Sequence, residues 1–146
     1  MDWKQAAIQR LKDYEVRKEA VELLGEQINN LEMQFSSIRS ARTDGEPVKG
    51  GSGNRREDML LSNIVLRDEL TANRKVAGRE IEITEKGLAA LNDEERRILE
   101  LFYISRPYDH VTRLCQELKV EKSEVYRRKN SALDKFTIAC YGVVRI

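Results

Sequence analysis

Basic and aromatic side chains are concentrated in one stretch of the 146-residue chain. In "VTRLCQELKVEKSEVYRRKN", residues 111–130, Tyr126 is followed directly by Arg127, Arg128 and Lys129. The segment 122–135 carries a net charge of +3, whereas the whole chain, with 26 basic and 25 acidic residues, carries only +1. A local basic surface of this kind favours a contact with phosphates, and a solvated helix face is the alternative interpretation.

Other residues that could support chemistry are few and scattered. Cys115 and Cys140 are too far apart for a CxxC pair, and one histidine, His110, does not complete a zinc ligand set with them. His110 also has no partner in a recognisable catalytic motif, and no phosphate-binding or dinucleotide-binding glycine motif is present. We therefore expect no enzyme activity, no metal and no cofactor.

Composition predicts a helix-rich protein that stays in the cytoplasm. Hydrophobic residues make up 40% of the chain and charged residues 35%, which is typical of a soluble domain. No run of eighteen apolar residues is present, and the start, "MDWKQAAIQR", has charges where a signal peptide has an apolar core. A membrane partner is not expected.

Residues 3–42 are predicted to form one long helix without proline. Its apolar residues follow a heptad-type spacing, with polar residues between them. These apolar positions are Leu11, Tyr14, Val21, Leu24, Ile28, Leu31, Phe35 and Ile38. Such a seam requires a partner helix.

A glycine-rich segment, residues 43–54, predicts a flexible connection to a second long helix. Asn54 and Glu57 have the spacing of a capping box at its start, and Gly78 and Gly87 suggest bends. Its predicted apolar stripe comprises Met59, Leu66, Leu70, Ala77, Ile81, Leu88 and Leu91. Residues 1–91 are thus predicted to form a helical hairpin or an intermolecular coiled coil, or both, that mediates self-association.

Residues 92–146 are predicted to form a separate domain of shorter helices. A second capping box, Asn92 with Glu95, starts a helix that ends near Pro107. Two further helices, joined at "KVEK", have apolar faces that fit a helix-turn-helix. The predicted fold class is therefore all-α, a long N-terminal helical hairpin or coiled coil followed by a C-terminal helix-turn-helix domain.

The segment 92–136 resembles region 4 of sigma-70-type transcription factors. "LNDEERRILELFYI" is similar to that family's "L-x-x-x-E-R-x-x-L-x-L-R-Y" element, and "LCQELKVEKSEVYRRKNSALDKF" follows its helix-turn-helix spacing. The chain is most similar to phage and prophage regulators of this type, including ArpU-type late regulators. It shares with them the long N-terminal helix, the glycine-rich segment, "RRED" at 55–58 and "VYR" at 125–127.

Three positions depart from the family's pattern. Lys119 stands where the turn usually has glycine, and Glu121 stands where the second helix usually has a Ser or Thr cap. We therefore expect a more irregular turn and a weaker helix cap. Arg128 occupies a position that is often apolar, and we expect its stem to pack along the helix while its head reaches a phosphate.

The resemblance places the base-contacting positions at Lys122, Ser123, Tyr126 and Arg127. Arg127 is the strongest candidate for guanine, because a guanidinium can bond O6 and N7 together. The backbone-contacting residues are expected to be Arg113, Arg128, Lys129 and Asn130.

The implied function is that of a phage-type transcription regulator that binds double-stranded DNA and contacts RNA polymerase as region 4 does. A complete sigma factor is not expected, because residues 1–91 lack the clustered aromatic and basic residues of the promoter-melting region. Two alternatives remain open. One is a small-terminase-like recognition subunit for DNA packaging, and the other is a coiled-coil adaptor that does not bind DNA.

Overall fold

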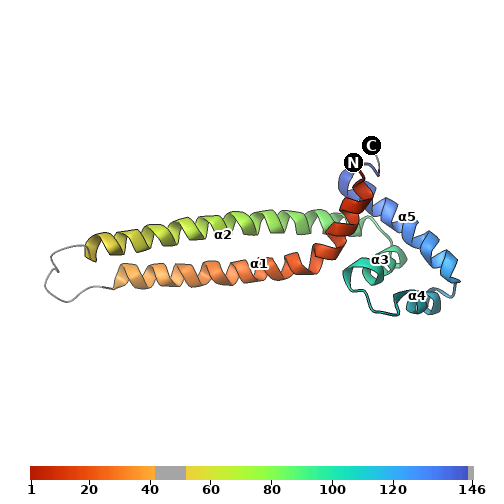
Figure 1. Ribbon diagram of the computed structural model, residues 1–146, viewed down its shortest axis with the longest axis horizontal. Coiled ribbons are helices and arrows are strands. Elements are labelled where there is room, and N and C mark those ends of the chain that lie inside the picture. The colour runs from red at the N-terminus through yellow and green to blue at the C-terminus, as the bar shows by residue number, and fades with distance from the viewer. Residues whose placement is uncertain (42–51, 145–146) are drawn as a thin grey trace. The chain divides into compact units, whose positions relative to one another are not determined.

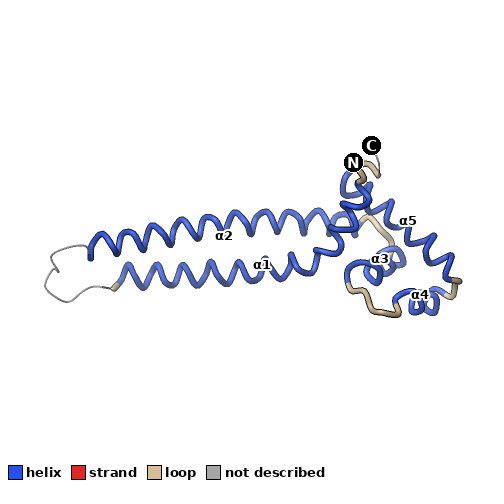
Figure 2. Tube along the Cα trace, viewed as in Figure 1, coloured by secondary structure: helices blue, strands red, loops and turns tan. Residues whose placement is uncertain are grey.

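The computed structural model describes residues 1–41 and 52–144, and every regular element among them is helical (Figures 1 and 2). The all-α prediction is confirmed for this part of the chain. The elements are α1 (Trp3–Ser40), α2 (Ser52–Ala89), α3 (Asp93–Leu99), η1 (Glu100–Ile104), α4 (His110–Leu118) and α5 (Lys122–Tyr141). None of these helices is long and apolar enough to span a membrane.

The chain forms two compact units, and their limits differ from the predicted boundary after residue 91. Unit 1 contains Met1–Lys18 together with the described chain from Arg79 onward, and unit 2 is Glu19–Gly78. The start of α1 and the end of α2 thus belong with α3, α4 and α5. The heptad-type pattern runs through both units without interruption, so the sequence gives no sign of the change in packing partner.

Helix α5 divides the apolar interior of unit 1 into two clusters. The first joins it to α1, to the segment just after α2 and to the end of α3, and comprises Ala7, Leu11, Leu91, Leu99, Ala132, Leu133 and Phe136. The second joins it to α3, η1 and α4, and comprises Ile98, Leu101, Phe102, Leu114 and Val125. All of these side chains are buried, so α5 is held firmly along most of its length.

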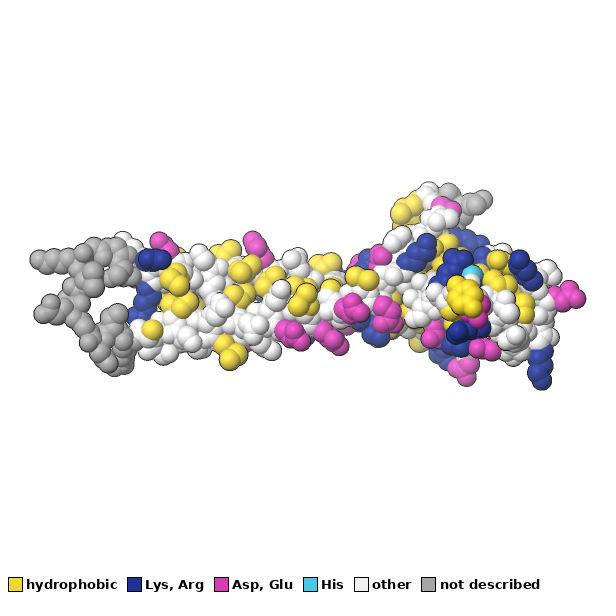
Figure 3. Space-filling view, turned by 60° about the horizontal axis from the view of Figure 1, so that its bottom comes forward, with side chains coloured by type: hydrophobic (Ala, Val, Ile, Leu, Met, Phe, Trp, Pro, Cys, Tyr) yellow, Lys and Arg dark blue, Asp and Glu magenta, His cyan; other side chains and the backbone are white. Residues whose placement is uncertain are grey.

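Unit 2 is a pair of antiparallel segments of α1 and α2 (Figure 1). The predicted seam positions of α1 from Val21 to Ile38 are partly buried, as expected. The stripe predicted for α2 is wrong at Met59 and Leu66, whose side chains remain 49% and 43% exposed. Hydrophobic side chains accordingly lie at the surface along the hairpin (Figure 3).

The start of α2 also differs from the prediction. The helix begins at Ser52, so Asn54 lies inside its first turn and is not its N-cap. The rest of the predicted connection, up to residue 51, lies outside the described residues.

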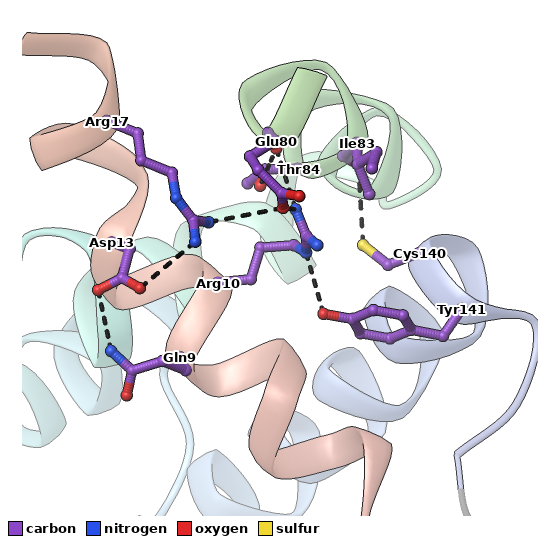
Figure 4. A network of polar contacts seen from close by, with 9 residues as sticks. All are labelled: Gln9, Arg10, Asp13, Arg17, Glu80, Ile83, Thr84, Cys140 and Tyr141. Carbon is purple, nitrogen blue, oxygen red and sulfur yellow. Dashed lines mark hydrogen bonds and ion pairs between the residues drawn. The ribbon is translucent and has the colours of Figure 1, made fainter. Parts of the chain in front are cut away.

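A polar network ties α1, α2 and α5 together within unit 1 (Figure 4). The guanidinium of Arg10 forms an ion pair of 2.5 Å with Glu80 and donates a hydrogen bond of 3.0 Å to the hydroxyl of Tyr141. Arg17 pairs with the same Glu80 carboxylate and with Asp13. Cys140 lies beside this network, and burial raises the pKa of its thiol to about 11, which is the behaviour of a packed, unreactive cysteine.

Gly87 permits the close approach of α2 and α5. A Cβ atom at this position would lie 2.5 Å from Cys140 Sγ and 2.6 Å from Phe136 Cε2, distances that real side chains do not adopt. We expected a bend at Gly87 and at Gly78, but α2 continues through both residues. The glycine at 87 is required for packing and not for a change of direction.

We therefore expect Gly87→Ala to destabilise the protein by about 1–3 kcal/mol, because the added methyl overpacks a fully buried contact. Gly78→Ala is the matched control, since a Cβ there meets nothing within 4 Å and alanine gains about 1 kcal/mol of helix propensity. Urea unfolding followed by circular dichroism measures both. Equal stability of the two variants would contradict the packing role of Gly87.

Candidate nucleic-acid interface

The capping box at Asn92 fixes the start of α3. The Asn92 side chain accepts a hydrogen bond of 2.8 Å from the Glu95 backbone amide, and the Glu95 carboxylate accepts one from the Asn92 amide. This arrangement was predicted from the sequence and is confirmed. It sets the register of the helix that carries Ile98 and Leu99 into the interior.

The helix then widens into the π-helical segment η1 before the predicted stop near Pro107. The Ser105 amide donates to the Glu100 carbonyl at 2.8 Å, a bond across five residues. Phe102 in this segment contacts His110 edge-to-face, with ring centroids 4.7 Å apart, and Tyr126 at 5.8 Å. The widened turn thus places one aromatic ring between the first residue of α4 and the exposed side of α5.

Helices α4 and α5 are joined by three residues whose conformation is that of a tight turn. Lys119 adopts the left-handed region, with φ 57° and ψ 45°, and its amide bonds to the Cys115 carbonyl. The expectation of an irregular turn is therefore wrong, because lysine here takes the conformation that glycine favours. The expected weaker cap is confirmed, since the Glu121 side chain makes no capping hydrogen bond.

The crossing of the two helices is closely packed. Leu114 of α4 and Val125 of α5 are fully buried in the same cluster as Ile98. Because these inward positions are fixed, the opposite face of α5 is presented to solvent as a rigid surface.

The predicted base-contacting positions all lie on this exposed face. The exposed residues of the first turns of α5 are Lys122, Ser123, Tyr126, Arg127 and Asn130. Tyr126 is 38% exposed, and its ring packs edge-to-face against that of Phe102. We call these five residues the α5 face.

A carboxylate that sequence reasoning missed, Glu124, binds two of the predicted arginines. Arg127 donates from Nε at 2.8 Å and from Nη2 at 2.5 Å, and Arg128 donates from Nε at 3.0 Å. Arg128 also forms an ion pair with Glu94 of α3. The pairs of Glu124 with Arg127 and Arg128 could have been predicted from the sequence, because Glu124 precedes the arginines by three and four residues on one helix.

These contacts hold the pKa of Glu124 far below its ordinary value. The hydrogen bonds from Arg127 and then Arg128 are the largest causes, and they lower the pKa from 4.5 to about 2. The carboxylate is therefore charged at neutral pH and neutralises part of the basic surface. Arg128, bound to α3 as well as to Glu124, is partly buried and does not extend towards solvent as expected.

The two remaining basic residues of the prediction have local partners. Lys129 places its ammonium 5.5 Å from the ring centre of Phe102 and 5.7 Å from that of Tyr126. Desolvation, and then the charge of Lys4, lowers the pKa of Lys129. Arg113 lies on α4, where its Nε atom is 3.0 Å from the Asp109 carboxylate.

His110 is buried at the start of α4 and acts as a packing residue. Burial, and then the charge of Arg106, lowers its pKa, so the imidazole is neutral at pH 7. Lys and Arg side chains gather near this single histidine on the face shown in Figure 3. The aromatic contacts of His110 and Tyr126 with Phe102 of η1 connect α4 and α5.

The depressed pKa of Glu124 gives a direct test of the charge network. Because its folded pKa lies below the ordinary one, the stabilisation is present above about pH 4.5 and is lost as the pH falls towards 2. We expect Arg127→Ala to raise the Glu124 pKa towards 4.5, as measured by NMR titration of the side-chain carboxyl. Arg96→Ala is the control, because Arg96 forms a similar pair with Asp93 on α3. An unchanged Glu124 pKa in the Arg127 variant would contradict the network.

Comparison with known proteins identifies a family but no function. Searches of curated proteins and of solved structures gave no match. Residues 36–137 match a family described as "Protein of unknown function (DUF1492)". This segment includes the last five residues of α1, all of α2, α3, η1 and α4, and α5 as far as Thr137. Since the match covers more than half of the chain, the protein belongs to the DUF1492 family.

Proposed function

We propose that the protein binds double-stranded DNA through the α5 face and acts in the cytoplasm as a phage-type transcription regulator. The observation that carries this proposal is the α5 face itself, in which five exposed polar or aromatic side chains stand on a helix whose other side is fully buried. In this proposal the protein acts by binding DNA and catalyses no reaction. The resemblance to sigma region 4 supports a transcriptional role and a contact with RNA polymerase.

The shape of this region suits the major groove of DNA. The groove is about 12 Å wide and admits one α-helix. Helix α5 extends from a three-residue turn, and its first turns carry the exposed side chains. The fixed crossing at Leu114 and Val125 orients those side chains before binding, which limits the entropy lost on binding.

The side chains of the α5 face have the chemistry needed for base edges and phosphates. Arg127 is 69% exposed and presents a planar guanidinium, which can bond guanine O6 and N7. Tyr126 offers a ring for a thymine methyl and a hydroxyl for a phosphate. Lys122, Ser123 and Asn130 add donors on the same face.

The Glu124 carboxylate opposes this contact, and the balance favours DNA. An exposed ion pair gains little because water and salt screen it. A bidentate bond between Arg127 and guanine forms in a less hydrated groove, together with phosphate contacts that release counterions. We therefore expect Arg127 to give up its ion pair with Glu124 and to bind DNA in its place. Arg128 keeps its second partner, Glu94, and we assign it to holding α5 against α3.

We expect Arg127→Ala to weaken binding to a site selected from random DNA by roughly 10-fold to 100-fold and to relax one base preference. Arg96→Ala, which removes an arginine with the same i,i+3 pairing on α3, should leave affinity unchanged. Fluorescence anisotropy at fixed salt measures both. Wild-type affinity in the Arg127 variant would exclude the α5 face as the base-contacting surface.

Glu124→Gln should have the opposite effect. It removes a negative charge beside the α5 face and frees Arg127, so we expect tighter binding to DNA of any sequence and a steeper dependence of affinity on salt. Asp93→Asn frees Arg96 in the same manner on α3 and serves as the control. Salt titrations of the two variants should differ, and weaker binding by Glu124→Gln would show instead that the carboxylate contacts a base directly.

A further inference from the structure

Unit 2 lacks the buried apolar core that unit 1 has. Twelve hydrophobic side chains are buried in the described chain, and all of them belong to unit 1. Among the described side chains of unit 2, residues 19–41 and 54–78, the single buried one is that of Asn63, which is 6% exposed. Two helices that pack only on each other do not cover their apolar surface, so this segment needs a further packing partner.

Hydrogen bonds cross the contact between α1 and α2 in unit 2, beside the partly buried apolar seam. Asn63 donates to the Leu31 carbonyl at 2.8 Å, and Arg74 donates to the Val21 carbonyl at 3.1 Å. Arg56 donates to the Arg39 carbonyl near the end of α1. These bonds fix the register of the two helices, as a polar residue in a coiled-coil seam does, but they bury little apolar surface.

The uncovered apolar surface includes a groove between the two helices. Leu31 and Ile38 of α1 and Met59 and Leu66 of α2 line it, beside the buried Asn63. Its volume is about 370 Å³. Met59 and Leu66 are each close to half exposed, which is unfavourable for neighbouring large side chains on a monomer.

We propose that this groove packs against the same groove of a second copy of the chain, so that two hairpins form a four-helix bundle. The seam that we had predicted for self-association, from Val21 to Ile38, is already partly buried in the hairpin. The second copy uses the side of the hairpin where Met59 and Leu66 remain exposed beside the seam residues Leu31 and Ile38, because these four side chains form one continuous groove.

Dimension and charge both favour a second copy as the partner. The α1 segment Glu19–Ser40 has 22 residues, and the face of two helices of this length measures on the order of 33 Å by 20 Å, near the ~800 Å² per partner of a stable interface. This α1 segment contains four glutamates and one arginine, and is therefore acidic. Residues 54–78 of α2 contain five basic and four acidic residues. A two-fold axis that runs along the hairpin sets α1 of each copy against α2 of the other, so that the acidic α1 segment lies beside the nearly neutral α2 segment and not beside a second acidic α1.

This inference does not depend on DNA binding, and its test contains no DNA. Sedimentation equilibrium of the full chain should show a dimer at about 10 μM, which corresponds to a dissociation constant of about 1 μM or less. Met59→Gln combined with Leu66→Gln should raise the dissociation constant by at least about 100-fold, because two apolar contacts occur twice in a two-fold interface. Glutamine keeps helix propensity, and circular dichroism should show unchanged helix content.

The control places the same substitution on exposed residues outside the groove. Leu61→Gln with Val65→Gln changes two side chains that are 60% and 56% exposed, and it should leave the dimer intact. A monomeric wild-type chain at about 100 μM would overturn the proposal. So would a dimer that survives the groove substitutions, or one that is lost only in the control.

Discussion

The burial of one face of α5 is the constraint on which the rest of unit 1 depends. Val125, Ala132, Leu133 and Phe136 point inward along successive turns and are all fully or almost fully buried. Phe136 also lies against Gly87, where any larger residue would collide with its ring. Because the inward face is fixed by two separate clusters, the direction of every outward side chain of α5 follows from the packing beneath it.

The charges around α5 show why a count of basic residues overstates its positive field. Arg127 and Arg128 share Glu124, Arg128 reaches Glu94, and Lys135 lies 2.9 Å from Glu95. Two of these carboxylates, Glu94 and Glu95, belong to α3, so a count of charges over residues 122–135 does not include them. Arg127 is the more exposed of these two arginines, and its pair with Glu124 can exchange partners, since salt screens it and the guanidinium is well hydrated when released. The basic side chains of this surface are therefore paired with carboxylates that a ligand can displace, and their positive charge is only partly available before binding.

Local patterns in the sequence predict the elements well and the partners of long helices poorly. The Asn92 capping box and the inward positions of α5 depend on neighbours three or four residues away, and both are confirmed. The division of α1 between two units depends on contacts with residues far along the chain, and a uniform heptad-type spacing cannot reveal it. Among the predicted site residues, exposure of the α5 face followed from periodicity, whereas the pairing of Arg128 with Glu94 required the three-dimensional arrangement of α3 and α5.

The two units of the chain solve the packing of long helices in opposite ways. In unit 1 the helices approach closely, use glycine at the nearest contact, and bury aliphatic and aromatic side chains completely. In unit 2 the seam is partly polar, and the donors Asn63 and Arg74 bond to carbonyl groups of the facing helix. A polar seam lowers the stability gained from pairing but allows only one register, because a shift of one residue would leave buried Asn63 without its acceptor. A hairpin built in this way is well defined in register yet weak by itself. Two of its exposed apolar side chains, Met59 and Leu66, lie on the groove side, where a further helix pair can supply the missing core.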